Sequence, residues 1–83
     1  MERSDIMNEL TRIIRDVLNN QSLVLNPETT AADVPDWDSV NHINIVVAAE
    51  QAFGIKFRTA EIEELRNIGE MVALIEKKLS QPR

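Results

Sequence analysis

Residues 36–54 read DWDSVNHINIVVAAEQAFG, and within them a polar turn gives way to a long apolar segment. Asp38 is a good N-cap, so we expect a helix over 39–53 that begins with Ser39. The many β-branched side chains of this segment favour a strand locally. Length decides for a helix, because the segment continues through alanine, glutamate and glutamine, and Gly54 suits the position after a last helical turn.

Apolar residues on both sides of this segment also recur at helical spacing. Upstream, the pattern predicts a helix over about 4–18, with Ser4 or Asp5 as its cap. Downstream, it predicts a short helix over 60–65 and a longer one over 68–79. The side chains expected to face the core are Ile6, Leu10, Ile13, Ile14, Val17 and Leu18 in the first helix, Ile62 and Leu65 in the short one, and Ile68, Met71, Val72, Ile75 and Leu79 in the last.

The connecting segments differ from ordinary solvated linkers. Residues 19–38 contain two prolines and no sustained period, yet several of their side chains, Trp37 among them, are apolar. We therefore expect this loop to lie on the helices and cover part of the core. Residues 55–58 alternate in hydropathy but are too few for a stable strand, so we interpret them as an extended connector that buries Ile55, Phe57 or both.

These elements predict an all-α fold: a four-helix bundle with three longer helices, one short third helix and a long loop between the first two. We expect residues 1–83 to form a single domain, because a chain of 83 residues has no room for a second core. At this size folding buries only about 60% of the unfolded chain's surface, so each apolar stripe counts toward stability.

The charge and composition exclude several classes of function. A formal net charge of −5 repels phosphate backbones, so we expect no nucleic-acid partner, and a basic protein surface is the natural complement. The chain has no cysteine, so any thiol chemistry must come from an added group. The longest apolar run, 45–49, is far shorter than the ~20 residues of a membrane span, and the first residues do not read as a signal peptide. The lack of cysteine fits the reducing cytoplasm, where we expect the protein to be located, and we expect it to be a monomer.

The turn Asp38-Ser39-Val40 opens a long helix after a long loop, in a small acidic chain of four helices. This combination resembles the acyl carrier proteins, the phosphopantetheine-binding carriers, and the resemblance extends from the first helix to about Leu79. It implies that Ser39 is esterified with 4′-phosphopantetheine, and that Asp38 helps to hold Mg²⁺ during the transfer. It also implies a non-catalytic carrier of thioesters, modified by a phosphopantetheinyl transferase and used by acyl-activating, acyltransferase or synthase enzymes.

The sequence departs from common fatty-acid carriers at the approach to Ser39. Those carriers offer a glycine-rich or small-residue approach, where this chain has Pro35-Asp36-Trp37. Asn41 and Asn44 also replace acidic residues that meet basic partner enzymes. The pattern is more similar to a specialised stand-alone carrier, serving fatty-acid-like, polyketide or other acyl transfer. Aryl, aminoacyl or peptidyl carriers share the chemistry and stay open as alternatives, as does a helical adaptor without a prosthetic group.

Three residues of the 39–53 helix are candidates for contact with partners. Val40 and Val47 lie at the edge of the face expected to be buried, so they form either an exposed apolar docking patch or part of the core. Glu50 is the acidic residue that remains to meet a basic partner. The face expected to be buried consists of Ile43, Val46, Ala49 and Phe53.

Trp37 and His42 flank the serine and have open roles. Trp37 stacks on pantetheine, positions the loop, or plugs an edge of the core, which is the commoner role of such a residue. His42 has no orienting acid visible in the sequence, so we interpret it as structural rather than as a general base. An aliphatic cargo would gain about 0.8 kcal/mol per buried CH₂ by folding back between the last three helices.

Overall fold

The computed structural model describes residues 2–80, and within this range it contains helices and no strand. The helices are α1 (Arg3–Val17), the 3₁₀-helix η1 (Ala31–Asp33), α2 (Ser39–Phe53), α3 (Thr59–Glu64) and α4 (Ile68–Ser80). The predicted all-α class with a short third helix is confirmed. Predicted and observed ends of α1, α3 and α4 differ by at most one residue, those of α2 coincide, and η1 was not predicted.

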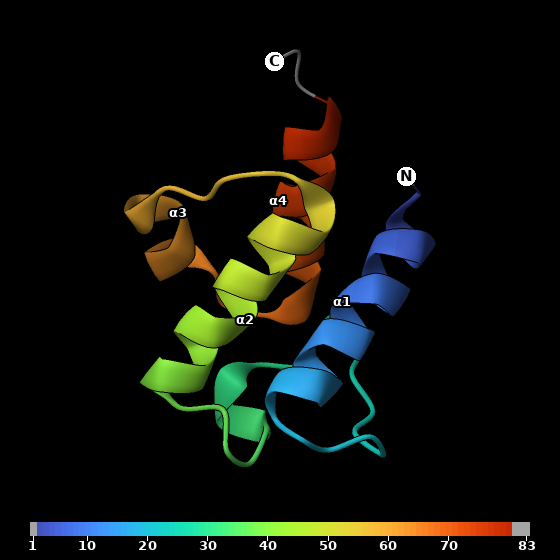
Figure 1. Cartoon of the computed structure of the whole chain (residues 1–83), viewed down its shortest axis with the longest axis vertical. Coiled ribbons are helices and arrows are strands. Elements are labelled where there is room, and N and C mark those ends of the chain that lie inside the picture. Colours follow the sequence, from blue (N-terminus) through green and yellow to red (C-terminus); the bar gives the residue numbers. More distant parts are fainter. Residues whose placement is uncertain (1, 81–83) are drawn as a thin grey trace.

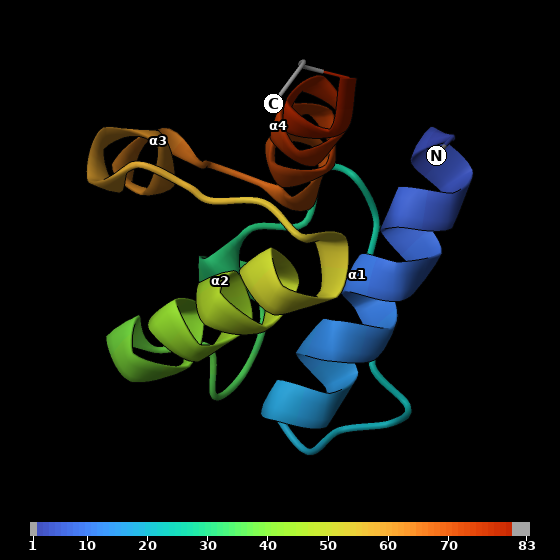
Figure 2. The ribbon, with the colours of Figure 1, turned by 45° about the horizontal axis from the view of Figure 1, so that its top comes forward.

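The three longer helices surround one core (Figure 1). Helix α1 packs against both α2 and α4, and the guanidinium of Arg3 pairs with the Glu76 carboxylate at 2.8 Å. The start of α1 and the end of α4 therefore lie at one end of the bundle, while both views place the start of α2 at the other (Figures 1 and 2). Within residues 2–80, no helix is both long and apolar enough to cross a membrane.

Fully buried side chains of three helices form the centre of the core. Each such side chain stabilises the folded chain by roughly 1.5–3 kcal/mol through removal of apolar area from water. The helical spacing predicted for α1 is confirmed, because its apolar stripe is buried. The largest completely buried residues are Ile6, Leu10 and Ile14 of α1, Ile45 of α2, and Ile68 and Ile75 of α4.

Helix α2 buries three of the four residues predicted for its core face, and the fourth, Ile43, is a correction. Its buried residues are Ile45, Val46, Ala49 and Phe53, whereas Ile43, expected in the core, is 53% exposed. The sequence of α2 is apolar on nearly every side, so its periodicity does not select one stripe. Packing against the neighbouring helices makes that selection, so that Ile45 is buried and Ile43 is exposed.

The long loop lies on the bundle, as predicted, and buries Leu25 and Val34. It is joined to the start of α4 by two backbone hydrogen bonds. The N–H of Ile68 donates to the Thr29 carbonyl at 2.9 Å, and the N–H of Gly69 donates to the Pro27 carbonyl at 2.8 Å. These bonds satisfy amides that a helix leaves without partners at its N-terminus. The loop is thereby fixed before it reaches α2.

The ends of two helices test the predicted caps. Gly54 ends α2 in the left-handed region, with φ 66°, as expected of a glycine after a last turn. The predicted cap of α1 is wrong: the helix begins at Arg3, Glu2 is its N-cap residue without a side-chain cap bond, and Ser4 and Asp5 lie inside the first turn. The acidic Asp5 in that turn still favours the helix through its dipole.

Candidate functional site

Ser39 is the first residue of α2, and its side chain is exposed. Asp38 is the N-cap, and its Oδ1 accepts a hydrogen bond from the N–H of Asn41 at 2.8 Å. The Ser39 hydroxyl has no hydrogen-bond partner among residues 2–80. Since the first amides of a helix lack intrahelical acceptors, the hydroxyl stands beside N–H groups and a positive dipole end that favour an attached anion.

The turn before Ser39 takes a backbone conformation that glycine usually supplies. Asp36 has a φ of 70°, in the left-handed region that aspartate tolerates better than most residues. Its carbonyl accepts two hydrogen bonds, from the N–H of Asp38 at 3.0 Å and from Nδ2 of Asn41 at 2.7 Å. Asp36 thus replaces the absent glycine, and Asn41 ties the turn to α2 instead of serving as a surface charge.

Trp37 and His42 contact each other across the start of α2. The indole Nε1–H of Trp37 donates to Nδ1 of His42 at 3.1 Å, and the ring centroids lie 6.1 Å apart. Trp37 is half-buried and packs against the core, as the commoner interpretation of this residue predicts. Burial lowers the pKa of His42, because the imidazolium loses hydration. The acceptor role of Nδ1 requires the neutral ring with its proton on Nε2.

An exposed apolar strip runs along α2 from the first turn. Val40 is 69% exposed, Ile43 53% and Val47 44%, and their spacing places them on one side of the helix. We call these three residues the α2 patch. The sequence left the exposure of Val40 and Val47 open and assigned Ile43 to the core, so the patch gains a member that periodicity did not identify.

Glu50 continues this side of the helix but has a contact that the sequence did not predict. It is half-buried, and its Oε2 accepts a hydrogen bond from the backbone N–H of Phe57 at 2.8 Å. Phe57 is buried, as expected for the connector, while Ile55 is half-buried. Glu50 therefore holds the connector to the bundle with one carboxylate oxygen.

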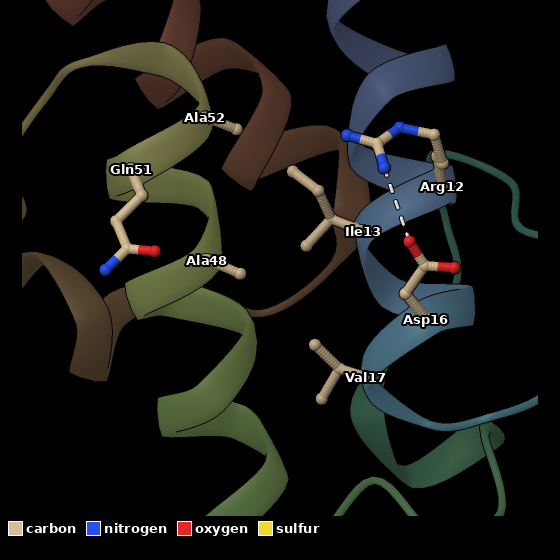
Figure 3. A pocket seen from close by; sticks show the side chains of 7 residues that line it. All are labelled: Arg12, Ile13, Asp16, Val17, Ala48, Gln51 and Ala52. Carbon is tan, nitrogen blue, oxygen red and sulfur yellow. Dashed lines mark hydrogen bonds and ion pairs between the residues drawn. The ribbon is translucent and has the colours of Figure 1, made fainter.

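Two hollows lie near α2. One holds about 30 Å³ and is lined by side chains that include Trp37, His42, Leu65 and Met71. This volume is comparable to the ~30 Å³ share of one water molecule, so the hollow is too small for an acyl chain. The other, of about 350 Å³, is an open groove between α1 and α2 (Figure 3), with Arg12, Asp16 and Gln51 at its polar rim and Ile13, Val17, Ala48 and Ala52 as its apolar lining.

The part of the chain that the structure describes has no group of three or more His, Cys, Asp or Glu side chains arranged to hold a metal ion. The carboxylate of Asp38 has one oxygen engaged in the cap, and its Oδ2 accepts no hydrogen bond from a residue between 2 and 80. Asp38 and Ser39 are both exposed at the start of α2.

Comparison with known proteins gives this arrangement a family. Residues 8–75 match the family model described as the phosphopantetheine attachment site. Over 75 residues the chain is 31% identical to an acyl carrier protein of Acidothermus cellulolyticus, covering 90% of this chain and 89% of that protein. It is also 31% identical to a meromycolate extension acyl carrier protein of Mycolicibacterium aurum, covering 90% of this chain and 77% of that one.

The fold agrees with this match. The chain superimposes on the solution NMR structure of a holo acyl carrier protein from Geobacter metallireducens with a TM-score of 0.84 and 40% identity, covering 89% of this chain and 85% of that chain. Sequence and fold thus agree over most of the chain, and the prosthetic group of such a domain is 4′-phosphopantetheine. This chain belongs to the acyl carrier protein family.

Proposed function

We propose that Ser39 is the residue to which 4′-phosphopantetheine is attached. The observation that carries this proposal is the exposed Ser39 hydroxyl, without a hydrogen-bond partner among residues 2–80, at the first residue of α2. A modifying enzyme can reach such an oxygen without breaking an internal contact. The amides and dipole of the first turn then favour the phosphodiester that results.

The residues around Ser39 fit this attachment. In loading, the Ser39 oxygen forms a bond to the pantetheine phosphate of coenzyme A and gives up its proton, and the nucleotide leaves as adenosine 3′,5′-bisphosphate. When attached, the group supplies the thiol that this cysteine-free chain lacks, and acyl groups are carried on it as thioesters. No base is held against the Ser39 hydroxyl among the described residues, so its activation is assigned to the modifying enzyme.

We assign to Asp38 two tasks at the same position. Its Oδ1 caps α2 and keeps Ser39 in the first turn. Its Oδ2 is available to the Mg²⁺ that the phosphopantetheinyl transferase brings with coenzyme A, since a carboxylate oxygen is a ligand that Mg²⁺ prefers. The negative charges of Asp38 and of a phosphate attached to Ser39 would otherwise repel each other. A cation bound by both groups offsets this repulsion.

We assign contact with partner enzymes to the side of α2 next to Ser39. The α2 patch supplies an apolar centre. The carboxylate of Glu50, which accepts one internal hydrogen bond, supplies an acidic edge. The partners proposed are the transferase and the acyl-activating, acyltransferase or synthase enzymes with which the family works. These enzymes modify and use the chain, which serves them as a monomeric, cytoplasmic, non-catalytic carrier of one domain. Its cargo belongs to fatty-acid-like, polyketide or another specialised acyl transfer, with aryl, aminoacyl and peptidyl groups as the alternative.

One experiment tests the attachment site. The chain is incubated with coenzyme A, Mg²⁺ and a broad-specificity phosphopantetheinyl transferase, and its intact mass is measured. Wild type is expected to gain one pantetheine arm, Ser39→Ala none, and the control Ser4→Ala one, because Ser4 is also an exposed serine near a helix start. An arm on Ser39→Ala would overturn the assignment, and an unmodified wild type across several competent transferases would favour an adaptor without a prosthetic group.

A further inference from the structure

We propose that Trp37 and His42 are positioning residues for the loading of Ser39, and that the hydrogen bond between them holds the turn before Ser39 on the first turn of α2. This inference depends on the proposed attachment at Ser39. It goes beyond that attachment because neither side chain touches the reacting atoms in the role proposed. Their contribution is to present the Ser39 hydroxyl and the Asp38 carboxylate together.

The geometry of the bond supports this role. Trp37 lies two residues before Ser39 and His42 three residues after it, so the 3.1 Å bond from Nε1 to Nδ1 spans the serine. The Trp37 side chain also packs against the core. The backbone of Trp37 is held less firmly, since its N–H reaches the Val34 carbonyl only at 3.4 Å. The side-chain bond is therefore the link that ties Trp37 itself to α2.

The turn needs such a link because its backbone is not in a relaxed conformation. Asp36 has a φ of 70°, which costs an L-residue energy that surrounding contacts must offset. Other contacts also hold it. The Asp36 carbonyl accepts from the N–H of Asp38 and from Nδ2 of Asn41, and Asp38 caps α2 and accepts a bond from the N–H of His42 at its carbonyl. Loss of the Trp37–His42 bond would remove one of these links, and the turn would spend less time in the conformation that presents Ser39 and Asp38 together.

The surroundings of His42 argue against a direct chemical role. Its Nδ1 is occupied by the indole, and the ring lines the small hollow that Leu65, Arg66 and Asn67 of the α3–α4 connector close from the other side. The imidazole therefore lines a small hollow together with residues of that connector. The conformation of the turn is what His42 controls, and the population of the loading-competent conformation sets the apparent rate of loading.

The experiment compares the initial rates of loading of Ser39 in the full chain, with coenzyme A, Mg²⁺ and one transferase. Trp37→Phe keeps an aromatic ring and removes the donor, and His42→Leu removes the acceptor. Each is expected to lower kcat/KM about fivefold, which corresponds to the net free-energy contribution of one hydrogen bond. His42→Asn, whose amide oxygen can accept from the indole in place of Nδ1, is expected to recover most of the rate. The double variant Trp37→Phe/His42→Leu is expected to be no slower than either single variant.

Two controls separate positioning from a loss of stability. Leu79→Ala removes a partly buried side chain near the end of α4 and is expected to lower the midpoint of unfolding without slowing loading. The indole N–H resonance of the single Trp reports the bond directly, and its shift in His42→Leu should be reversed in His42→Asn. A structural role alone would make the rate follow the midpoint of unfolding rather than this resonance.

The outcomes distinguish the two proposals. Loading at Ser39 with equal rates in wild type, Trp37→Phe and His42→Leu would overturn the positioning role and leave the attachment site intact. Equal rates in His42→Asn and His42→Leu, both below wild type, would also overturn it. The hydrogen-bond acceptor at position 42 would then have no effect on the rate of loading. A wild-type chain loaded at a residue other than Ser39 would overturn the attachment site itself, and the positioning role with it.

Discussion

The carboxylate of Glu50 accepts a hydrogen bond from the backbone N–H of Phe57 at 2.8 Å. A side chain in the last turns of α2 thereby holds the connector that leads into α3, and with it the buried ring of Phe57. Glu50 also lies on the same side of α2 as the α2 patch. Glu50 thus holds the connector by an internal hydrogen bond and also lies at the surface that we propose binds partner enzymes.

We expect Glu50→Ala to lower the free energy of unfolding by about 1–2 kcal/mol, because it removes a charged acceptor from the N–H of a buried residue. Glu50→Gln keeps an acceptor at that position and should lose less. Urea denaturation measures both, with Gln51→Ala as the exposed neighbour whose effect should stay within about 0.5 kcal/mol. Equal losses for Glu50→Ala and Glu50→Gln would show that the charge, and not the hydrogen bond, stabilises the connector.

The two tasks assigned to Asp38 separate in a pair of substitutions. Asp38→Ala removes the cap of α2 and should cost about 1 kcal/mol of stability, whereas Asp38→Asn keeps a capping oxygen and should cost little. Both remove the negative charge, so both should slow the transfer of phosphopantetheine. Unfolding curves and loading rates are measured on the same preparations. Wild-type loading of Asp38→Asn would mean that the carboxylate has no part in holding Mg²⁺.

The α2 patch should matter for binding more than for folding. Val40→Ala and Val47→Ala change exposed side chains, so we expect the free energy of unfolding to stay within about 0.5 kcal/mol of wild type while the KM of the transferase for the chain rises. Ile45→Ala, at a residue with 0% exposure, should instead cost about 2–5 kcal/mol. A large loss of stability in the two valine variants, with an unchanged KM, would show that these residues contribute to the core and not to partner binding.

The lowered pKa of His42 predicts the sign of a pH effect on stability. Burial places the folded-state pKa below the ordinary value of about 6.5, so between these two values the unfolded chain binds more protons. The free energy of unfolding should therefore rise with pH through this window, level off above about 6.5, and be lost as the pH falls through the folded-state pKa. The difference between wild type and His42→Asn, measured by urea denaturation from about pH 5 to 8, isolates this contribution. Stability that falls with rising pH in this window would contradict the assignment.

Several features could be predicted because they depend on neighbours along the chain. The stripe of Ile6, Leu10 and Ile14 identifies the buried face of α1, since polar residues separate its apolar positions. Asp38 and Gly54 identify the two ends of α2 through capping chemistry that involves only adjacent residues. The exposed position of Ser39 at the first turn follows from the same local chemistry. These elements also carry the resemblance to acyl carrier proteins.

Other features depend on how the helices and the connecting segments pack together, and the tertiary structure alone decides them. Helix α2 is apolar on nearly every side, so only its packing in the bundle buries Ile45 and exposes Ile43. The Trp37 indole bonds the His42 ring, and the backbone N–H of Phe57 bonds the Glu50 carboxylate, and both bonds require loop and helix to meet in a geometry that no spacing rule encodes. Local propensities define the helices and their ends, whereas burial and the choice of hydrogen-bond partner depend on how the whole chain packs.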